Sequence, residues 1–247
     1  MSSKIGLKLS KNYSINFSLP KRSKIQIKFL IIHYTGMKKE SDAINKLCNP
    51  LSKVSSHYYI KRNGELLNLV PDLYEAWHAG KSHWKNFKSL NKNSIGIEIT
   101  NPGHEHGYKK FTQKQIASLK KILRYLSKKY KIKKENILGH SDISPDRKKD
   151  PGERFPWQKL AKENLCQWHN LNKIKLKRFR KIKSSSKQKE EFLINLSKIG
   201  YRKVNQKETF QNNKILTTAF QRRFRQELID GQIDKECYII SKKLINY

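Results

Sequence analysis

Alternating apolar and polar residues predict strands in the first half of the chain. Residues 26–34, which read QIKFLIIHY, are rich in isoleucine and aromatic side chains and predict a buried strand. Residues 94–100 alternate strictly, with three isoleucines on one face and Gly96, Glu98 and Thr100 on the other. A carboxylate at Glu98, opposite a hydrophobic face, is therefore either solvated or placed in a cleft.

Between these strands the pattern predicts a short helix and a hairpin. Residues 41–47 favour the helix. Residues 57–60 and 65–70 read as strands, and they flank Asn63 and Gly64, a dipeptide that suits a tight turn. We therefore expect two antiparallel strands joined at this dipeptide.

A longer helix is predicted at about residues 112–130. Thr112 and Gln115 have the spacing of a capping box. The apolar stripe of this helix consists of Ile116, Leu119, Ile122, Leu123 and Leu126. Residues 136–139 then predict a short strand that delivers His140. The mixture of strands, helices and a hairpin predicts an α/β fold with a central mixed β-sheet flanked by helices.

The composition changes near residue 172. Residues 173–189 are basic and interrupted by serines, which is typical of a linker. Three short helical patterns follow, at 190–199, about 214–228 and about 234–245, and they predict a small C-terminal three-helix domain.

These changes divide the chain into four segments. They are an N-terminal arm (1–23), an α/β domain (24–172), a basic linker (173–189) and a helical domain (190–247). The helical domain lies near the lower size limit for independent folding.

The formal net charge is +34, from 54 Lys and Arg residues against 20 Asp and Glu residues. A charge of this size attracts polyanions, such as nucleic acid, anionic lipid and the carboxylate-bearing wall of bacteria. A specific nucleic-acid partner is disfavoured, because the chain lacks a helix-turn-helix, zinc-finger or RNA-recognition pattern. The basic run 173–189 also holds a single aromatic residue, Phe179.

Targeting signals and disulfides are not expected. No run approaches the ~18 consecutive apolar residues of a transmembrane helix. The N-terminal lysines are followed by no apolar run, so an ordinary signal peptide is not predicted and the cytoplasm is favoured. Cys48, Cys166 and Cys237 are odd in number and far apart, which predicts free thiols. A metal in this chain would be held by histidine and carboxylate.

Three residues have the chemistry of a catalytic zinc site. His33 ends the first predicted strand, His140 follows a later one, and Asp150 lies ten residues further on in the sequence KKDPG. Two imidazoles and one carboxylate leave a fourth zinc position for water. Their spacing alone does not establish that they meet, so structural histidines remain the alternative.

Six segments occur in an order typical of one enzyme family. They are Ile31–Thr35, Ser55–Tyr58, Ala76–Gly80, Ser94–Glu98, Gly139–Asp142 and Lys148–Gly152. Together they resemble the AmpD/AmiD branch of the peptidoglycan amidases, which are related to phage amidase lysozymes and to animal peptidoglycan-recognition proteins. The resemblance covers about residues 26–165 and implies the same mixed-sheet fold.

The resemblance implies a role for each of five residues. It makes His33, His140 and Asp150 the ligands of Zn²⁺, with Asp150 where many relatives have a cysteine. It makes Glu98 the catalytic acid and base, and Lys148 the residue that stabilises the oxyanion. Without the resemblance, Glu98 would be interpreted as an exposed strand residue and Lys148 as a solvated charge.

Other histidines and the tail are assigned as follows. Trp77 and His78 are expected to line the substrate cleft, with core packing as the alternative for Trp77. His104 and His106 are interpreted as solvated loop residues. His57 is interpreted as structural.

The run AFQRRF at 219–224 resembles the peptidoglycan-binding module that follows the AmiD catalytic domain. An ordinary helical stripe is the alternative. If the resemblance holds, the module tethers the enzyme to the wall.

We therefore predict a zinc-dependent N-acetylmuramoyl-L-alanine amidase. Its substrate would be peptidoglycan or a muropeptide, with N-acetylmuramic acid or its anhydro form. The alternative is a peptidoglycan-recognition protein without activity. The absent signal peptide favours the cytoplasm, whereas the resemblance to two-domain relatives favours the periplasm or the cell envelope. The sequence leaves the oligomeric state open.

Overall fold

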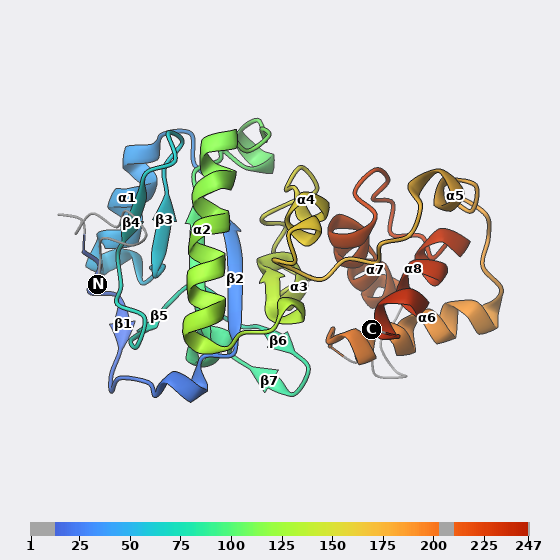
Figure 1. Cartoon of the computed structure of the whole chain (residues 1–247), viewed down its shortest axis with the longest axis horizontal. Coiled ribbons are helices and arrows are strands. Elements are labelled where there is room, and N and C mark those ends of the chain that lie inside the picture. Colours follow the sequence, from blue (N-terminus) through green and yellow to red (C-terminus); the bar gives the residue numbers. More distant parts are fainter. Residues whose placement is uncertain (1–12, 203–209, 247) are drawn as a thin grey trace.

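The computed structural model describes residues 13–202 and 210–246, apart from the side chain of Phe210 (Figure 1). Residues 1–12 of the predicted N-terminal arm lie outside the described residues. The domain boundaries predicted from the sequence remain predictions.

A five-stranded mixed sheet forms the centre of the larger part of the chain. Its order is β4-β3-β8-β2-β9. The bounds are β2 (Phe29–Tyr34), β3 (Tyr58–Ile60), β4 (Leu66–Asn68), β8 (Ser94–Ile99) and β9 (Ile137–Gly139). Strands β3, β8, β2 and β9 run parallel, and β4 pairs antiparallel with β3. The predicted mixed sheet and the predicted hairpin are confirmed.

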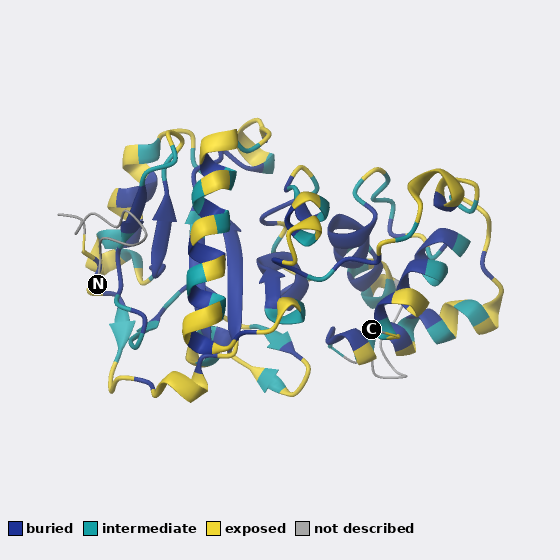
Figure 2. Cartoon of the chain, in the orientation of Figure 1, coloured by how far each residue is buried: buried dark blue, intermediate teal, exposed yellow. Residues whose placement is uncertain are grey.

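Helices cover both faces of this sheet. Helix α1 (Glu40–Cys48) packs its buried face on Tyr59 and Leu67. Helix α2 (Gln113–Tyr130) belongs to the larger core, together with Tyr58. Adjacent residues of a strand point to opposite faces, so α1 and α2 lie on opposite sides. Figure 2 shows residues of different exposure alternating along α2, and the buried strand β2 beside it.

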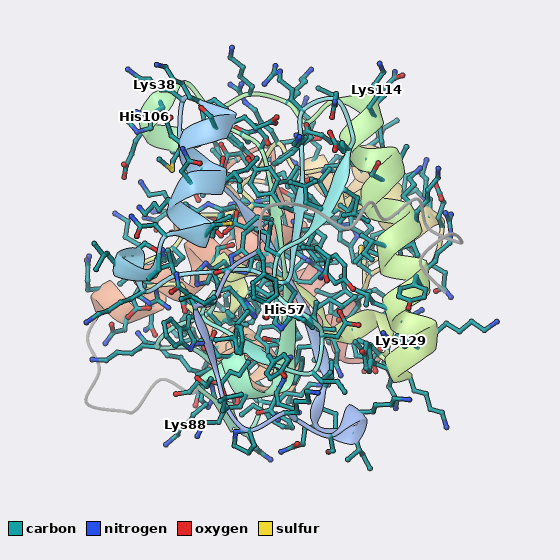
Figure 3. The ribbon with its side chains drawn as sticks, turned by 90° about the vertical axis from the view of Figure 1, so that its left-hand side faces the viewer. Lys38, His57, Lys88, His106, Lys114 and Lys129 are labelled. Atoms are coloured by element: carbon teal, nitrogen blue, oxygen red, sulfur yellow. The ribbon has the colours of Figure 1, made fainter. Side chains whose placement is uncertain are left out.

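The capping box predicted for α2 is present. The hydroxyl of Thr112 accepts a hydrogen bond from the backbone N–H of Gln115. The Gln115 side chain in turn accepts one from the backbone N–H of Thr112. This reciprocal pair determines where the helix begins. Figure 3, seen from the α1 side, places Lys114 and Lys129 of α2 at the periphery and His57 near the centre.

Short elements complete the fold. The remaining strands are β1 (Phe17–Ser18), β5 (Glu75–Ala76), β6 (His83–Trp84) and β7 (Phe87–Lys88). The 3-10 helices are η2 (Lys24–Gln26), η3 (Pro50–Ser52), η4 (Leu90–Asn93), η5 (His104–His106) and η6 (Lys134–Asn136). The remaining α-helices are α3 (His140–Ile143), α4 (Trp157–Lys162), α5 (Lys173–Lys177), α6 (Ser186–Ile199), α7 (Phe210–Phe224) and α8 (Lys235–Ile245).

The segment before the sheet is held by one buried arginine. The guanidinium of Arg22 donates to the carbonyl oxygens of Asn91 at 2.8 Å, Ser94 at 2.7 Å and Asp72 at 2.6 Å. Only 7% of Arg22 is exposed. These bonds join the start of the chain to the edge from which β8 begins.

The C-terminal helices α6, α7 and α8 share one hydrophobic core with the sheet domain. Gly200, which ends α6, lies against Trp84, and a Cβ there would come within 2.4 Å of the indole Cε2. The guanidinium carbon of Arg223 on α7 lies 3.4 Å from the centroid of a Trp157 ring. The three predicted C-terminal helices are confirmed, and α7 packs against the region of α3 and α4 (Figure 1).

A polar contact reinforces this docking. The hydroxyl of Tyr201 donates to Oδ1 of Asp142 at 2.9 Å, and Nη1 of Arg223 lies 3.6 Å from Oδ2. Oδ2 also accepts the backbone N–H of Gly139 at 2.7 Å. Asp142 therefore connects the C-terminal helices with the end of β9, directly before His140.

We expect Asp72 to contribute strongly to stability. Its carboxylate accepts hydrogen bonds from Tyr58 at 2.6 Å, from Lys129 at 2.7 Å and from Tyr130 at 2.6 Å. Asp72→Asn should lower the free energy of unfolding by about 1–3 kcal/mol, because charge-assisted buried bonds are lost. Urea unfolding at neutral pH measures this. Asp146→Asn, an exposed carboxylate, is the control.

The Asp72 effect should depend on pH in a defined direction. Burial acts to raise the pKa of Asp72, but the bonds from Lys129, Tyr130 and Tyr58 hold it below its ordinary value. A lowered folded-state pKa stabilises above the unfolded pKa, near 3.9, and this contribution declines as the pH falls through the folded value. The difference between wild type and Asp72→Asn should therefore shrink under acid. A constant difference would contradict this assignment.

Candidate active site

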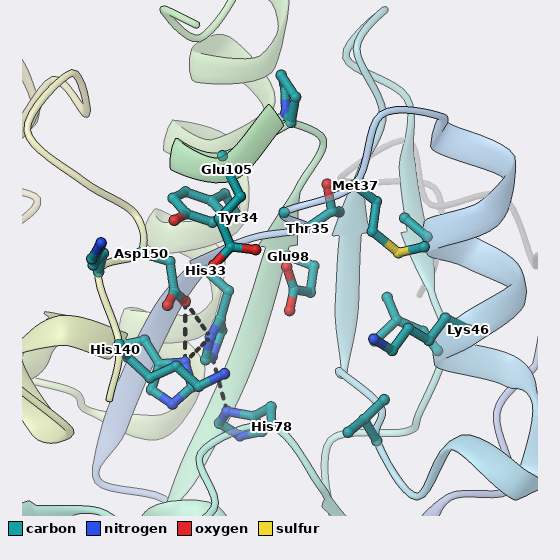
Figure 4. Close-up of a pocket in the computed structure, with 18 of the residues that line it drawn as sticks. His33, Tyr34, Thr35, Met37, Lys46, His78, Glu98, Glu105, His140 and Asp150 are labelled. Carbon is teal, nitrogen blue, oxygen red and sulfur yellow. Dashed lines mark hydrogen bonds and ion pairs between the residues drawn. The ribbon is translucent and has the colours of Figure 1, made fainter. Parts of the chain in front are cut away.

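Three neighbouring parallel strands bring the candidate residues to one edge of the sheet. His33 on β2 is paired in register with Glu98 on β8. His140 follows β9 directly, and β9 pairs with β2. The carboxyl ends of parallel strands are a common location for ligand sites, because loops diverge there and leave a crevice. Figure 4 shows these side chains around one pocket.

Three atoms of the predicted zinc site converge. Nδ1 of His33 lies 3.0 Å from Nδ1 of His140 and 3.0 Å from Oδ2 of Asp150. Nδ1 of His140 lies 3.1 Å from the same oxygen. No other group of three His, Cys, Asp or Glu side chains with metal-site spacing occurs within residues 13–202 and 210–246.

This arrangement fits a zinc ion. Tetrahedral zinc bonds of ~2.0–2.2 Å separate neighbouring ligand atoms by about 3.3–3.6 Å, a few tenths of an ångström more than the 3.0–3.1 Å found here. The two nitrogen donors and one carboxylate oxygen are of the type that zinc prefers. All three residues are buried. The site can therefore hold a divalent metal through its own side chains.

The protonation states also suit a metal ligand set. Burial and the neighbouring His140 lower the pKa of His33 to about 4, so its imidazole is neutral at pH 7. Burial acts to raise the pKa of Asp150, but His140 and His33 keep it well below the ordinary value. A neutral imidazole and an ionised carboxylate both offer lone pairs to a cation.

Glu98 lines the pocket beside these atoms. Burial, reinforced by the charge of Asp150, raises the pKa of Glu98 to about 8. Its Oε2 is shielded from solvent and has no hydrogen-bond partner among the described residues. A bound cation opposes this shift, because it favours the carboxylate. Glu98 is thus a carboxyl group whose pKa lies close to neutral, as acid–base catalysis requires.

Basic residues line the same pocket on two sides. Lys148 is half-buried, and its charge lowers the pKa of both His33 and Glu98. Lys46 of α1 faces the pocket from the other side of Glu98 (Figure 4). The pocket therefore combines a candidate metal site, a carboxyl group and at least two cations.

Comparison with known proteins identifies the family. Residues 23–153, more than half of the chain, match the family model described as N-acetylmuramoyl-L-alanine amidase. The chain belongs to this amidase family. The amidase is also 34% identical over 233 residues to N-acetylmuramoyl-L-alanine amidase AmiD of Escherichia coli K12, covering 89% of this chain and 83% of AmiD.

Other relatives match part or all of the amidase. 1,6-Anhydro-N-acetylmuramyl-L-alanine amidase AmpD of Haemophilus influenzae is 40% identical over 108 residues, which cover 43% of this chain and 56% of AmpD. The structure of Escherichia coli AmiD with its substrate, anhydro-N-acetylmuramic acid-L-Ala-D-gamma-Glu-L-Lys, matches with a TM-score of 0.78 and 32% identity over 93% of this chain and 92% of AmiD. AmpDh3 of Pseudomonas aeruginosa with anhydromuramic pentapeptide matches with a TM-score of 0.79 and 27% identity, over 97% of this chain and 98% of AmpDh3.

Trp77 and His78 of the amidase both border the pocket. The indole N–H of Trp77 donates to Oγ of Ser18 at 2.9 Å, so one edge of its ring is fixed by the chain before the sheet. His78 contacts His33, with 3.1 Å between Nδ1 of His78 and Nε2 of His33. The substrate contacts expected of both residues remain predictions.

His104 is not a freely solvated loop residue. Its Nδ1 lies 2.8 Å from the hydroxyl of Tyr34, and its Nε2 lies 3.1 Å from Oε2 of Glu153. Its ring stacks on Tyr108, with the centroids 4.5 Å apart. His104 and Tyr34 both line the pocket, whereas His106 is exposed as expected. The sequence contained no signal for this contact, because it joins loops that are distant in the chain.

No helix in the described part of the amidase combines the length and apolar character that a bilayer span needs. The described thiols of Cys48, Cys166 and Cys237 are free, as predicted.

Proposed function

We propose that this amidase is zinc-dependent and hydrolyses the amide bond between N-acetylmuramic acid, or its anhydro form, and L-alanine. His33, His140 and Asp150 would hold the zinc ion. The observation that carries this proposal is the convergence of three buried ligand atoms, about 3 Å apart, beside a carboxyl group in one pocket. The bound muropeptides named for AmiD and AmpDh3 support the same substrate class.

The chemistry divides among the side chains of the pocket. A zinc ion at this site would supply an acidified water and polarise the substrate carbonyl. Glu98 takes a proton from the attacking water and passes it to the leaving nitrogen of L-alanine. The ammonium group of Lys148 donates a hydrogen bond to the carbonyl oxygen as negative charge develops on it. No nucleophilic side chain is required.

A release assay tests the activity and its metal dependence. Purified protein is incubated with an anhydro-muropeptide and, separately, with polymeric peptidoglycan, and the free stem peptide is quantified. We expect release that stops after chelation and returns with zinc. Tight binding of either substrate without release would instead indicate a recognition protein. The ratio of the two rates distinguishes soluble from polymeric substrates.

Removal of Lys148 should affect turnover more than binding. Lys148→Ala should lower kcat by about 10²–10³-fold, because an oxyanion donor acts mainly in the transition state. KM should change much less. Lys128→Ala on the exposed side of α2 removes the same charge away from the pocket and should keep wild-type kinetics. A Lys148→Ala enzyme with normal kcat would refute this role.

A further inference from the structure

One short segment contacts the rear of both candidate histidine ligands. Nε2 of His33 lies 3.1 Å from Nδ1 of His78. Nε2 of His140 lies 3.2 Å from the carbonyl oxygen of Ala79. Two neighbouring residues therefore contact the far nitrogens of two imidazoles, one on strand β2 and the other directly after β9. Figure 4 shows His78 below His33, with the bond drawn.

The tautomer of His140 follows from its partner. A carbonyl oxygen can only accept a hydrogen bond, so the contact with Ala79 requires a proton on Nε2 of His140. An imidazole that binds a metal is neutral and therefore has one N–H. Nδ1 of His140 therefore keeps its lone pair, and this atom faces Asp150.

The tautomer of His33 follows from a chain of bonds that ends at the backbone. The hydroxyl of Ser94 donates its single hydrogen to the carbonyl oxygen of Leu90 at 2.6 Å. Toward Nε2 of His78, 3.2 Å away, this hydroxyl can only accept. His78 is therefore protonated at Nε2 and accepts at Nδ1. The proton between the two imidazoles belongs to Nε2 of His33, which leaves the Nδ1 lone pair facing the other candidate ligands.

Packing holds this segment in place. Oδ1 of Asn91 accepts the backbone N–H groups of His78 at 3.1 Å and Ala79 at 2.6 Å. The His78 ring lies directly on Gly96 of β8, where a Cβ would come within 2.5 Å of its Cγ. His78 is 8% exposed and Ser94 is fully buried. Water therefore competes little for these bonds.

We propose that His78 and Ala79 form a positioning element that sets the orientation and tautomer of His33 and His140, so that both Nδ1 atoms face the metal. The inference rests on the proposed function, since it assumes that these histidines bind zinc. It gives His78 a role other than substrate contact. Loss of a hydrogen-bond partner behind a metal ligand typically weakens metal binding by about 10–100-fold.

Two substitutions at one position separate the hydrogen bond from the rest of the side chain. His78→Leu removes the acceptor for Nε2 of His33. His78→Asn retains one, because the amide oxygen stands near the place of the imidazole Nδ1. Zinc affinity is measured on the full chain by competition with a chelating dye. We expect His78→Leu to bind about 10–100-fold more weakly and His78→Asn to recover most of the affinity.

The control and a second readout address folding. His106→Leu removes an exposed loop histidine and should leave zinc affinity unchanged. Circular dichroism verifies that each variant is folded. Nitrogen-15 NMR of the metal-free protein reports the tautomer of His33, which should carry its proton on Nε2 in wild type and lose this preference in His78→Leu.

The outcomes distinguish the two proposals. A folded His78→Leu with wild-type zinc affinity would overturn the positioning role alone. Wild-type protein that binds no zinc would overturn the proposed function. If His78→Leu does not fold, nitrogen-15 NMR of the wild-type protein tests the positioning role. A proton on Nδ1 of His33 in the metal-free protein would contradict the hydrogen bonds that run from Ser94 through His78 to His33.

Discussion

Replacing Glu98 with glutamine should lower kcat by about 10²–10⁴-fold, the usual contribution of a positioned acid–base group. The amide keeps the size of the side chain but cannot take a proton from water. Zinc affinity should be nearly unchanged, because Glu98 is not among the three converging ligand atoms. Steady-state kinetics on an anhydro-muropeptide, together with a zinc titration, measure both quantities. Glu105→Gln, an exposed carboxyl group at the pocket, is the matched control.

The same residue predicts the shape of the pH profile. A general base works only when it is ionised, so kcat/KM should fall as the pH drops below the pKa of Glu98 in the zinc enzyme. Burial places that pKa at about 8 without metal, and the cation shifts it downward. The acid limb should disappear in the residual activity of Glu98→Gln. An unchanged acid limb in the variant would assign it to another group.

Asp150→Ala should weaken zinc binding by more than the ~10–100-fold expected when a hydrogen-bond partner of a zinc ligand is lost. Amidase activity should be lost together with the zinc. The substitution removes one of three donors, and with it the only carboxylate among them. Added zinc at high concentration should restore at most a small part of the turnover. Zinc titration and the release assay, performed in parallel, measure the effect.

Asp146→Ala is the control for this experiment. It removes an exposed carboxylate from the same loop, four residues earlier, and should retain both zinc binding and turnover. Wild-type zinc affinity in Asp150→Ala would exclude Asp150 as a ligand. Activity that survives exhaustive chelation of the wild type would exclude metal dependence itself.

Local patterns in the sequence were enough to predict the main elements. The capping box at Thr112 occurs as expected, and the dipeptide at Asn63 joins two antiparallel strands. Element ends were less predictable. The strand expected from residue 26 begins at Phe29, because residues 24–26 form a 3-10 turn. The helix expected at about 214–228 spans Phe210–Phe224.

Long-range relations could not be obtained from local patterns. His33 and His140 are separated by 107 positions, and only the pairing of β2 with β9 brings them together. The family resemblance anticipated this convergence, but the residues alone did not. The contact of His78 with His33 was missed for the same reason, since no periodicity links a loop residue to the rear of a strand histidine.

Arginine burial was also not predictable. Arg222, Arg223 and Arg225, at or just after the end of α7, are at most 9% exposed, although the chain has a net charge of +34. Their charges find partners in other segments, such as Glu153 near the pocket and Asp234 before α8. Charged residues are rarely buried without such partners, and the partners are visible only in three dimensions.

The seam between Gly200 and Trp84, and between Arg223 and Trp157, has a consequence for how this enzyme could be re-engineered. A variant truncated before α6 would expose the indoles of Trp84 and Trp157. It should therefore aggregate rather than act as a smaller, independent catalyst. A different domain fused in place of these helices would need a complementary apolar surface to cover the two indoles. If the C-terminal helices bind the wall, the packing between them and the sheet domain would set the distance between the point of attachment and the bond that is hydrolysed.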